Sequence, residues 1–433
     1  MRSSASARRQ IHSDLTILDA LRGLAALYVL LHHARWLLWT GREGYLLSQG
    51  RGFGYLLATL AGFLRYGEEA VLLFFLISGF CIHYRQASML ATARGVAGPA
   101  DRPLFDVRSY AWRRFRRLYP PLLVALAMTA LFDYLGARLN PDFYAGRTGY
   151  ALISGWFLDR GRPDLGVLHS FTTLMGNLLF QSSLAVPAFG TDTPLWSLAF
   201  EFWFYVLYPV PLLLSSRFGA RTMMGVVGIV SVAALLVSPS SSSWVPGWIL
   251  RVLTYWAIWV GGALIAEAYV GRIQFAGLRW LMPLAVTGLI ALAINADTPF
   301  FGTNGTVHYA EPQLTPLLWS ASLGVLLAYV TLSAPARFRR RIEQAARCLA
   351  PLGDISYSLY LVHLPWLGLL SAWWLSSHER LPLGAELAVP GAISALTLGV
   401  CCWYLVERHF MSPRLARPVS EAQPTASLAA RPA

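Results

Sequence analysis

The chain has 433 residues, of which 56% are hydrophobic and 13% are charged, and its mean hydropathy is +0.49. Soluble domains usually carry about 25% charged residues, so this composition excludes a soluble globular protein and indicates a polytopic membrane protein. The formal net charge of +13 is the balance of 35 arginines against 22 acidic residues, and the chain has no lysine. Because basic residues of a membrane protein first reflect its orientation in the bilayer, we expect no nucleic-acid partner.

Ten segments are long and apolar enough to cross a membrane as helices, a requirement of about 20 residues. They cover residues 18–39, 69–88, 118–136, 195–214, 222–238, 248–269, 280–295, 316–333, 352–375 and 386–406. Residues 168–186 contain a histidine and two amide side chains, so we expect them to be re-entrant or to lie on the surface. The sequence therefore predicts an all-α, polytopic membrane helical bundle of about ten transmembrane helices in residues 1–411. Residues 412–433, rich in Pro, Ala and Ser, are predicted to form a disordered cytoplasmic tail.

The distribution of arginines predicts the orientation of the bundle. With the N-terminus in the cytoplasm, the inside segments collect 24 arginines and the outside segments collect eight. Cytoplasmic loops of membrane proteins are enriched in basic residues, so both ends of the chain are predicted to be cytoplasmic. The four cysteines show neither a disulfide framework nor metal-ligand spacing, and we predict no metal site.

The first apolar segment carries ionisable groups, namely Asp19, Arg22, His32 and His33. A charged side chain costs roughly 2.5–3.5 kcal/mol at the centre of a bilayer, so such groups are displaced to the interface, paired or functional. Arg22 and His33 are eleven residues apart and share one helix face, about 16 Å apart along the axis. We expect Asp19 to pair with Arg22, and His33 to lie deeper and to face the same cavity. The alternative is that Arg22 reaches the interface and the histidine only bonds a neighbouring helix.

The next two segments contain a small-residue contact and a basic cluster. In FFLISGFCIHYR, Ser78 and Gly79 predict a close helix contact, and nothing around Ser78 resembles a nucleophile motif. In RSYAWRRFRRLYPP, four arginines lie at the predicted cytoplasmic surface: Arg113, Arg114, Arg116 and Arg117. They either anchor the helix at the membrane or hold phosphate groups bidentately, for which coenzyme A is a suitable ligand.

Two later segments also carry polar side chains. In TPLWSLAFEFWFYVLYP, Glu201 lies within an aromatic and aliphatic run, where it needs a cation, a histidine or water as its partner. A structural pairing with an arginine such as Arg22 is the alternative. In GDISYSLYLVHLPW, Ser356, Tyr360 and His363 follow one helix face, either facing inward to a site or serving as packing contacts.

Together these stretches resemble the acyltransferase 3 family of integral membrane O-acyltransferases over nearly the whole chain. The family's first-helix motif of an arginine, ten residues and a histidine is matched by Arg22 and His33. Later family motifs are matched by FFLISGF, RRFRRLYPPLL, WSLAFEFWFY, ISYSLYLVHLP and VERHF. The chain departs from the family at His32, a second candidate histidine, at Phe202 in place of a second glutamate, and at His409 in place of a proline. The hydrolase-like domain that some relatives add is not expected here.

The resemblance implies an enzyme that moves an acyl group, with acetyl expected, from acyl-CoA to a hydroxyl of a cell-surface or lipid-linked carbohydrate. It implies a multi-pass protein of the bacterial inner membrane, with acetyl-CoA as donor substrate and no permanently bound cofactor. The partners would be the lipid bilayer, acyl-CoA and the carbohydrate acceptor, with glycan-assembly proteins as further candidates. A glycan or lipid transporter or flippase is the competing class. The sequence leaves open the acceptor, the acyl length and the oligomeric state.

Under the enzymatic interpretation, His33 acts as general base or carries the acyl group transiently, Glu201 orients its imidazole, and Arg22 helps to hold the donor. His32 remains an alternative to His33. The arginine cluster and Ser78 are assigned to the donor. The other polar residues assigned to the pocket are Asp19, Trp196, Ser197, Tyr205, Ser356, Tyr360 and His363.

Overall fold

The computed structural model describes residues 4–48, 52–93, 105–145, 147, 165–237, 245–295 and 314–411. These residues are predominantly helical and contain no β-strand, which confirms the predicted all-α class. The predicted tail, residues 412–433, lies outside the described residues.

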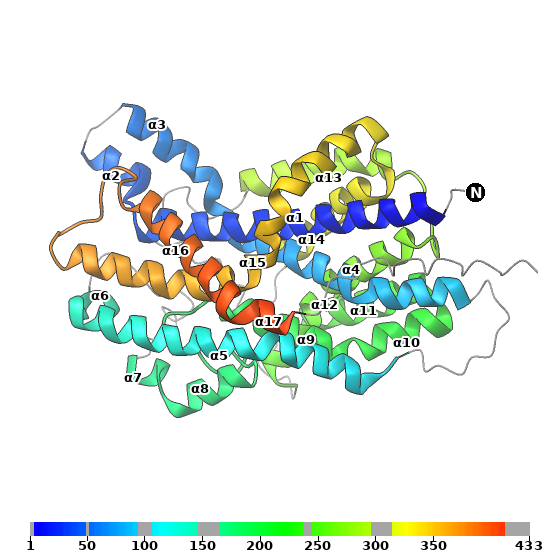
Figure 1. The fold of residues 1–433 in the computed structure, drawn as a ribbon, viewed down its shortest axis with the longest axis horizontal. Helices are drawn as coiled ribbons and strands as arrows, with labels where there is room; N and C mark the ends of the chain where they lie inside the picture. Colours follow the sequence, from blue (N-terminus) through cyan, green and yellow to red (C-terminus); the bar gives the residue numbers. More distant parts are fainter. Residues whose placement is uncertain are drawn as a thin grey trace, which may run out of the picture.

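Long helices run along the longest axis of the molecule and form one bundle (Figure 1). They are α1 (Ser4–Leu37), α4 (Gly67–Ala93), α5 (Val107–Leu139), α9 (Leu195–Leu207), α10 (Pro209–Phe218), α11 (Ala220–Val237), α12 (Gly247–Tyr269), α13 (Leu278–Asn295), α14 (Leu314–Ala328), α15 (Ala336–Leu375) and α16 (Ala388–Cys402). The shorter elements are α2 (Gly41–Leu47), α3 (Phe53–Leu60), η1 (Ala61–Arg65), α6 (Pro141–Tyr144), α7 (Leu165–Leu168), α8 (Phe171–Leu178), η3 (Tyr329–Ser333), η4 (Trp403–Glu407) and α17 (Arg408–Phe410).

Seven helices of the described residues are long and apolar enough to cross a membrane, or eight if the bent pair α9 and α10 is one span. This agrees with a multi-pass protein, although the sequence predicted about ten spans. Each predicted segment does fall on a helix. The apolar part of α13 is short, and α4 begins with two glutamates and carries His83 and Arg85 in its second half. The 43° bend between α9 and α10 follows from Pro209, which cannot donate a backbone hydrogen bond.

The two ends of the bundle carry the segments that the sequence assigns to opposite sides of the membrane. The start of α1, the end of α4 and α10 lie toward one end, on the right in Figure 1, and α2, α3 and α6 lie at the other. We refer to the first as the predicted cytoplasmic end and to the second as the predicted external end.

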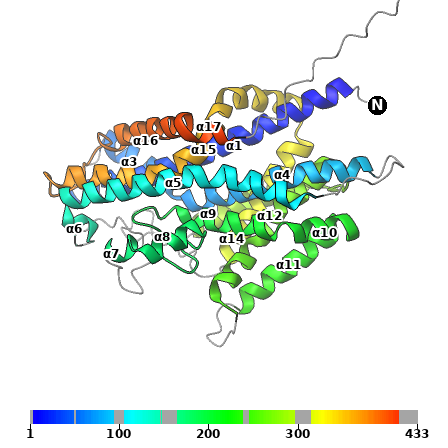
Figure 2. The same ribbon diagram turned by 60° about the horizontal axis from the view of Figure 1, so that its bottom comes forward.

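The segment around α7 and α8 lies beside α5 without crossing the bundle (Figure 2). The two helices have four and eight residues, too few to span a membrane, which confirms the expectation for residues 168–186. His169 attaches the segment to α5, because its Nε2 atom lies 3.1 Å from Oδ2 of Asp133. The same carboxylate accepts hydrogen bonds from the backbone nitrogen and hydroxyl of Thr191, at 2.9 and 2.6 Å.

Two close helix crossings position the polar side chains of the interior. The helix α1 packs most extensively on α15, where a side chain at Gly23 or Gly353 would collide with the opposite helix. The helix α4 packs on α12, where a side chain at Gly79 or Gly262 would meet a backbone carbonyl of its neighbour. The predicted close contact at Gly79 is therefore confirmed, and it brings the adjacent Ser78 against α12.

Candidate functional site

A cavity of about 100 Å³ lies among α1, α4, α5, α9 and α15. Most of the polar residues predicted from the sequence line it, although they come from segments far apart in the chain. These residues are Arg22, Ser78, Arg114, Arg117, Ser197, Glu201, Tyr205, Ser356 and Tyr360. The bundle therefore brings cations, a carboxylate and hydroxyl groups to one place.

The Glu201 carboxylate is the centre of a hydrogen-bond network in this cavity. The hydroxyl of Ser78 donates to Oε1 of Glu201 at 2.8 Å, and the hydroxyl of Tyr205 donates to the same oxygen. The indole of Trp259 donates to Oγ of Ser78 at 3.2 Å. The direct side-chain partners are therefore two hydroxyls instead of the expected histidine or cation, because Tyr205 is one helical turn after Glu201 and the α4–α12 crossing presents Ser78.

Arg22 takes part in three contacts at the edge of the cavity. One guanidinium nitrogen lies 3.5 Å from Oδ1 of Asp19, which confirms their predicted pairing. The other donates to the backbone oxygen of Gly353 at 3.3 Å and to Oγ of Ser356 at 3.2 Å. Asp19 is not among the cavity-lining residues, so its contribution is to hold Arg22.

The arginine cluster of α5 divides into two pairs. Arg114 and Arg117, three residues apart, line the cavity, whereas Arg113 and Arg116 do not. Helical periodicity turns the second pair away from the cavity, and the predicted hold of all four arginines on the donor phosphates stays a prediction. The charge of Arg117 acts on Glu201 and Tyr205, and the Arg114 guanidinium lies 5.5 Å from the centre of the Tyr205 ring.

His33 has a histidine as its partner. Its Nδ1 atom lies 2.8 Å from Nε2 of His363, which is 1% exposed. Nδ1 of His363 lies 2.8 Å from the carbonyl oxygen of Tyr360 and 3.1 Å from that of Leu359. A carbonyl only accepts, so Nδ1 of His363 carries the proton and its Nε2 accepts from Nδ1 of His33. Nε2 of His33 is then left with a lone pair.

Two predictions about His33 are therefore corrected. It does not line the cavity that contains Glu201, and its imidazole contacts the side chain of His363 instead of Glu201. The parallel packing of α1 on α15 produces both the Arg22–Ser356 and the His33–His363 contacts, and this directs the imidazole toward α15. His32 has a different partner: its Nδ1 atom lies 2.7 Å from the carbonyl oxygen of Leu64, while its ring lies edge to face with that of His33, with ring centres 4.9 Å apart.

Tyr360 joins the cavity to the histidine pair. Its side chain lines the cavity, its hydroxyl lies 2.7 Å from Oγ of Ser197, and it donates to the carbonyl oxygen of Pro194 at 3.1 Å. Its own carbonyl accepts the proton of His363. Trp196 was assigned to the pocket but does not line it, and it packs instead on Phe75, with ring centres 6.3 Å apart.

The structure adds two residues to the site that sequence reasoning missed. Tyr357 lines the cavity and donates to the carbonyl oxygen of Leu118 at 3.0 Å. Glu407 is buried and accepts hydrogen bonds from the nitrogen and hydroxyl of Ser358 at 3.1 and 2.6 Å. The charge of Arg117 acts on Glu407 as well. In the sequence, the position of Glu407 in the VERHF motif could have indicated that it belongs to the site.

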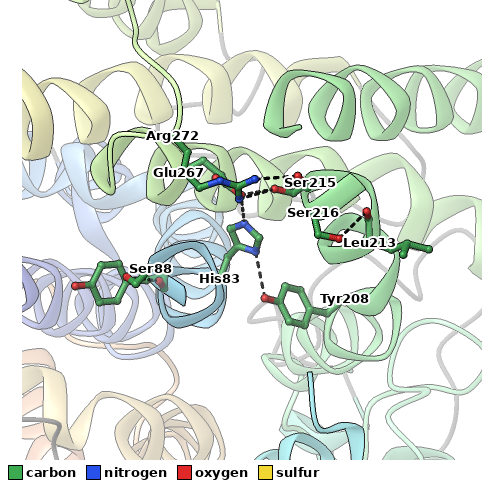
Figure 3. Close-up of polar contacts among 9 residues, drawn as sticks. His83, Ser88, Tyr208, Leu213, Ser215, Ser216, Glu267 and Arg272 are labelled. Carbon is green, nitrogen blue, oxygen red and sulfur yellow. Dashed lines mark hydrogen bonds and ion pairs between the residues drawn. The ribbon is translucent and has the colours of Figure 1, made fainter. Parts of the chain in front are cut away.

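A second polar network lies at the predicted cytoplasmic end of α4, α10 and α12 (Figure 3). Glu267 is fully buried, and its Oε1 lies 2.7 Å from both Nε2 of His83 and a guanidinium nitrogen of Arg272. It also accepts from the hydroxyl of Ser215, while Nδ1 of His83 lies 3.1 Å from the hydroxyl of Tyr208. In the sequence, the one sign of this network was the single carboxylate of Glu267 within an apolar segment. The network joins three helices and is distinct from the Glu201 cavity.

Known proteins resemble this chain in sequence. No solved structure matches the chain. Acyltransferase MdmB of Streptomyces mycarofaciens is 26% identical over 360 residues, which cover 81% of this chain and 78% of that protein. The model of the acyltransferase domain known as acyltransferase 3 matches residues 15–408. The chain therefore belongs to the acyltransferase 3 family and is a multi-pass membrane O-acyltransferase.

Proposed function

We propose that this enzyme transfers an acetyl group from acetyl-CoA, bound from the predicted cytoplasmic end, to a hydroxyl of a cell-surface or lipid-linked carbohydrate in a bacterial inner membrane. The main support is that one cavity combines arginines with the Glu201 network and adjoins the His33–His363 pair through Tyr360.

The charges of the cavity favour an anionic donor. Three arginines line it, whereas Glu201 is its one acidic lining residue and Glu407 lies nearby. Guanidinium groups bind phosphate oxygens bidentately. The volume of about 100 Å³ is below the 300–1,000 Å³ typical of drug-sized ligands. It therefore suits a thin neutral arm that ends in a thioester, with the charged nucleotide of coenzyme A outside at the arginines.

The tautomer of the histidine pair suits general base catalysis. Nε2 of His33 takes the proton of the acceptor hydroxyl while the hydroxyl oxygen attacks the thioester carbonyl. The ester C–O bond forms, the C–S bond breaks, and the proton passes from His33 to the coenzyme A thiolate. Nδ1 of His33 keeps its proton throughout, and His363 stabilises the imidazolium that forms in between.

The positions along α1 suggest that donor and acceptor arrive from opposite ends. His33 follows Arg22 by eleven residues, about 16 Å toward the predicted external end. His363 is buried, whereas His33 is partly exposed and lies next to the ring of Trp36, with ring centres 5.8 Å apart. An acceptor carbohydrate would therefore reach His33 from outside, while the acyl arm reaches it from the arginines.

The test is an acyl-transfer assay with purified protein in lipid nanodiscs, radiolabelled acetyl-CoA and a panel of lipid-linked and free oligosaccharides. We expect label on a carbohydrate, released by mild base because the product is an ester, and no transfer by His33→Ala. A base-stable label, or equal transfer by His33→Ala, would contradict the proposal. Label retained on the protein without acceptor would indicate a covalent acyl-histidine instead of direct transfer.

A further inference from the structure

Two adjoining hollows lie on the α11 side of the predicted cytoplasmic end, away from the Glu201 cavity. One has a volume of about 450 Å³ and is lined by the turns before α11 and after α12, including Arg221 and Arg272. The other has a volume of about 750 Å³ and follows α11 from Arg221 to Leu236. Both are lined by Arg221, Ile273 and Gln274, so they are continuous. We call the combined surface the α11 groove.

The head of the α11 groove carries positive charge without a matching acid. Residues 209–281 contain five arginines and a single acidic residue, Glu267. That carboxylate is fully buried and paired with Arg272 and His83 (Figure 3). Arg221 is exposed and makes no hydrogen bond or ion pair within the part of the chain that the structure describes. Its guanidinium is therefore available to an anion.

The remainder of the groove is apolar and has a floor of small residues. At Gly225 and Gly228 a Cβ atom would meet no described atom within 4 Å, so both positions are open. Ile229, Val232 and Leu236 are exposed along the same wall. From Arg221 to Leu236 the helix rises about 22 Å, which exceeds half of the roughly 30 Å hydrocarbon core of a bilayer. The groove is long enough for one acyl chain within a leaflet.

We infer that the α11 groove binds an anionic phospholipid of the cytoplasmic leaflet, with its phosphate at Arg221 and one acyl chain along α11. Charge complementarity selects the headgroup, and the continuous apolar wall distinguishes a lipid from a soluble phosphate. Arg272 is fixed behind the headgroup by Glu267 and by Ser215, whose Oγ and carbonyl oxygen accept its hydrogen bonds at 3.1 and 3.0 Å. The site does not depend on the acyl-transfer proposal.

The experiment measures binding of phosphatidylglycerol and phosphatidylcholine with identical acyl chains to delipidated full-length protein, by native mass spectrometry. Arg221→Gln removes the charge, and Gly228→Leu fills the groove without a charge change and with a better helix former. The matched controls are Arg341→Gln, an exposed arginine on α15, and Val226→Leu, on α11 outside the groove. We expect the affinity of Arg221→Gln for phosphatidylglycerol to be roughly five-fold lower than that of wild type. The affinity of Gly228→Leu should fall by at least as much. The two control variants should bind phosphatidylglycerol with an affinity within two-fold of wild type.

Any one of four results would overturn the inference. An equal loss in Arg341→Gln would mean general surface attraction, and equal binding of phosphatidylcholine would mean no headgroup site. Displacement of phosphatidylglycerol by equimolar glycerol phosphate would mean a soluble phosphate ligand. Arg221→Lys keeps the charge and should retain most of the binding. If Arg221→Gln fails to fold, Gly228→Leu against Val226→Leu decides the question, and unchanged phosphatidylglycerol binding in Gly228→Leu rejects the groove.

Discussion

His33 on α1 and His363 on α15 are joined by a 2.8 Å contact between Nδ1 and Nε2, although 330 residues separate them in the chain. The first belongs to the arginine–histidine motif of the opening helix and the second to the ISYSLYLVHLP motif. Two motifs that looked independent in the sequence therefore form one unit, in which the backbone carbonyls of α15 fix the proton positions of both rings.

His33→Ala should abolish acyl transfer, whereas His32→Ala should retain it. Loss of a general base typically costs 10²–10⁴ in rate, and Nδ1 of His32 is held by the carbonyl oxygen of Leu64 instead of by His363. Turnover of both variants is measured with labelled acetyl-CoA after gel filtration shows that they are folded. Activity in His33→Ala together with an inactive His32→Ala would move the assignment by one residue.

His363→Phe should lower kcat more than KM, because it keeps the ring volume and removes the acceptor for the proton on Nδ1 of His33. A wrong histidine tautomer has cost roughly 10⁴ in a well-studied hydrolase, so we expect a fall of at least about 10². The readout is the pH profile of kcat beside the melting temperature. If His363→Phe has the kcat and the pH profile of wild type, His363 has only a packing role.

Arg114→Gln with Arg117→Gln should raise the KM for acyl-CoA more than that for the acceptor. Hydrogen bonds to charged groups are worth about 1.5–3 kcal/mol each, so a rise of roughly 10- to 100-fold is expected for a lost phosphate contact. The matched control is Arg113→Gln with Arg116→Gln, which removes the same charge from the face that does not line the cavity. Equal effects of the two double variants would reduce the cluster to membrane anchoring.

Glu267→Ala should destabilise the protein by about 3–5 kcal/mol, because it leaves the buried guanidinium of Arg272 without its carboxylate. Glu267 is fully buried and contacts His83, Ser215 and Arg272. The free energy of unfolding in detergent micelles measures this effect. Ser216→Ala is the control, since that hydroxyl bonds only the nearby carbonyl oxygen of Leu213. A change below about 1 kcal/mol in Glu267→Ala would contradict the structural role of the network.

The attachment of the α7–α8 segment should weaken as pH rises. Burial opposes the charged form of His169, but the hydrogen bond and charge of Asp133 outweigh it and raise the pKa of the imidazole above 6.5. The stabilisation from this contact is therefore fully present below about pH 6.5, the pKa of a histidine in the unfolded chain. It is lost as the pH rises through the higher pKa of His169 in the folded protein. Thermal unfolding between pH 5 and 9 should show this loss, and His169→Gln should remove that part of the pH dependence. A variant with the wild-type pH dependence would refute the assignment.

Local patterns in the sequence were enough for the helices and for some of their contacts. Each of the ten predicted apolar segments falls on helical residues, and the i, i+3 spacing of Asp19 and Arg22 predicted their pairing. The small residue Gly79 predicted a close crossing. Each of these features depends on one helix and its immediate chemistry, so the sequence of that helix contains the necessary information.

Contacts between helices could not be obtained in the same way. The sequence paired His33 with Glu201, whereas the fold pairs His33 with His363 and Glu201 with Ser78 and Tyr205. The sequence also grouped the four arginines of the α5 cluster, but of these only Arg114 and Arg117 line the Glu201 cavity.

The sequence by itself determined the membrane-spanning helical class and the inventory of polar side chains, because hydropathy and charge are properties of single segments. The tertiary structure decided which of those side chains meet. The rotation of a helix about its axis and its position along its neighbour are set by packing summed over whole crossings, such as Gly23 on Gly353 and Gly79 on Gly262. A rotation by one residue, about 100°, would exchange the arginines that face the cavity and separate the two histidines.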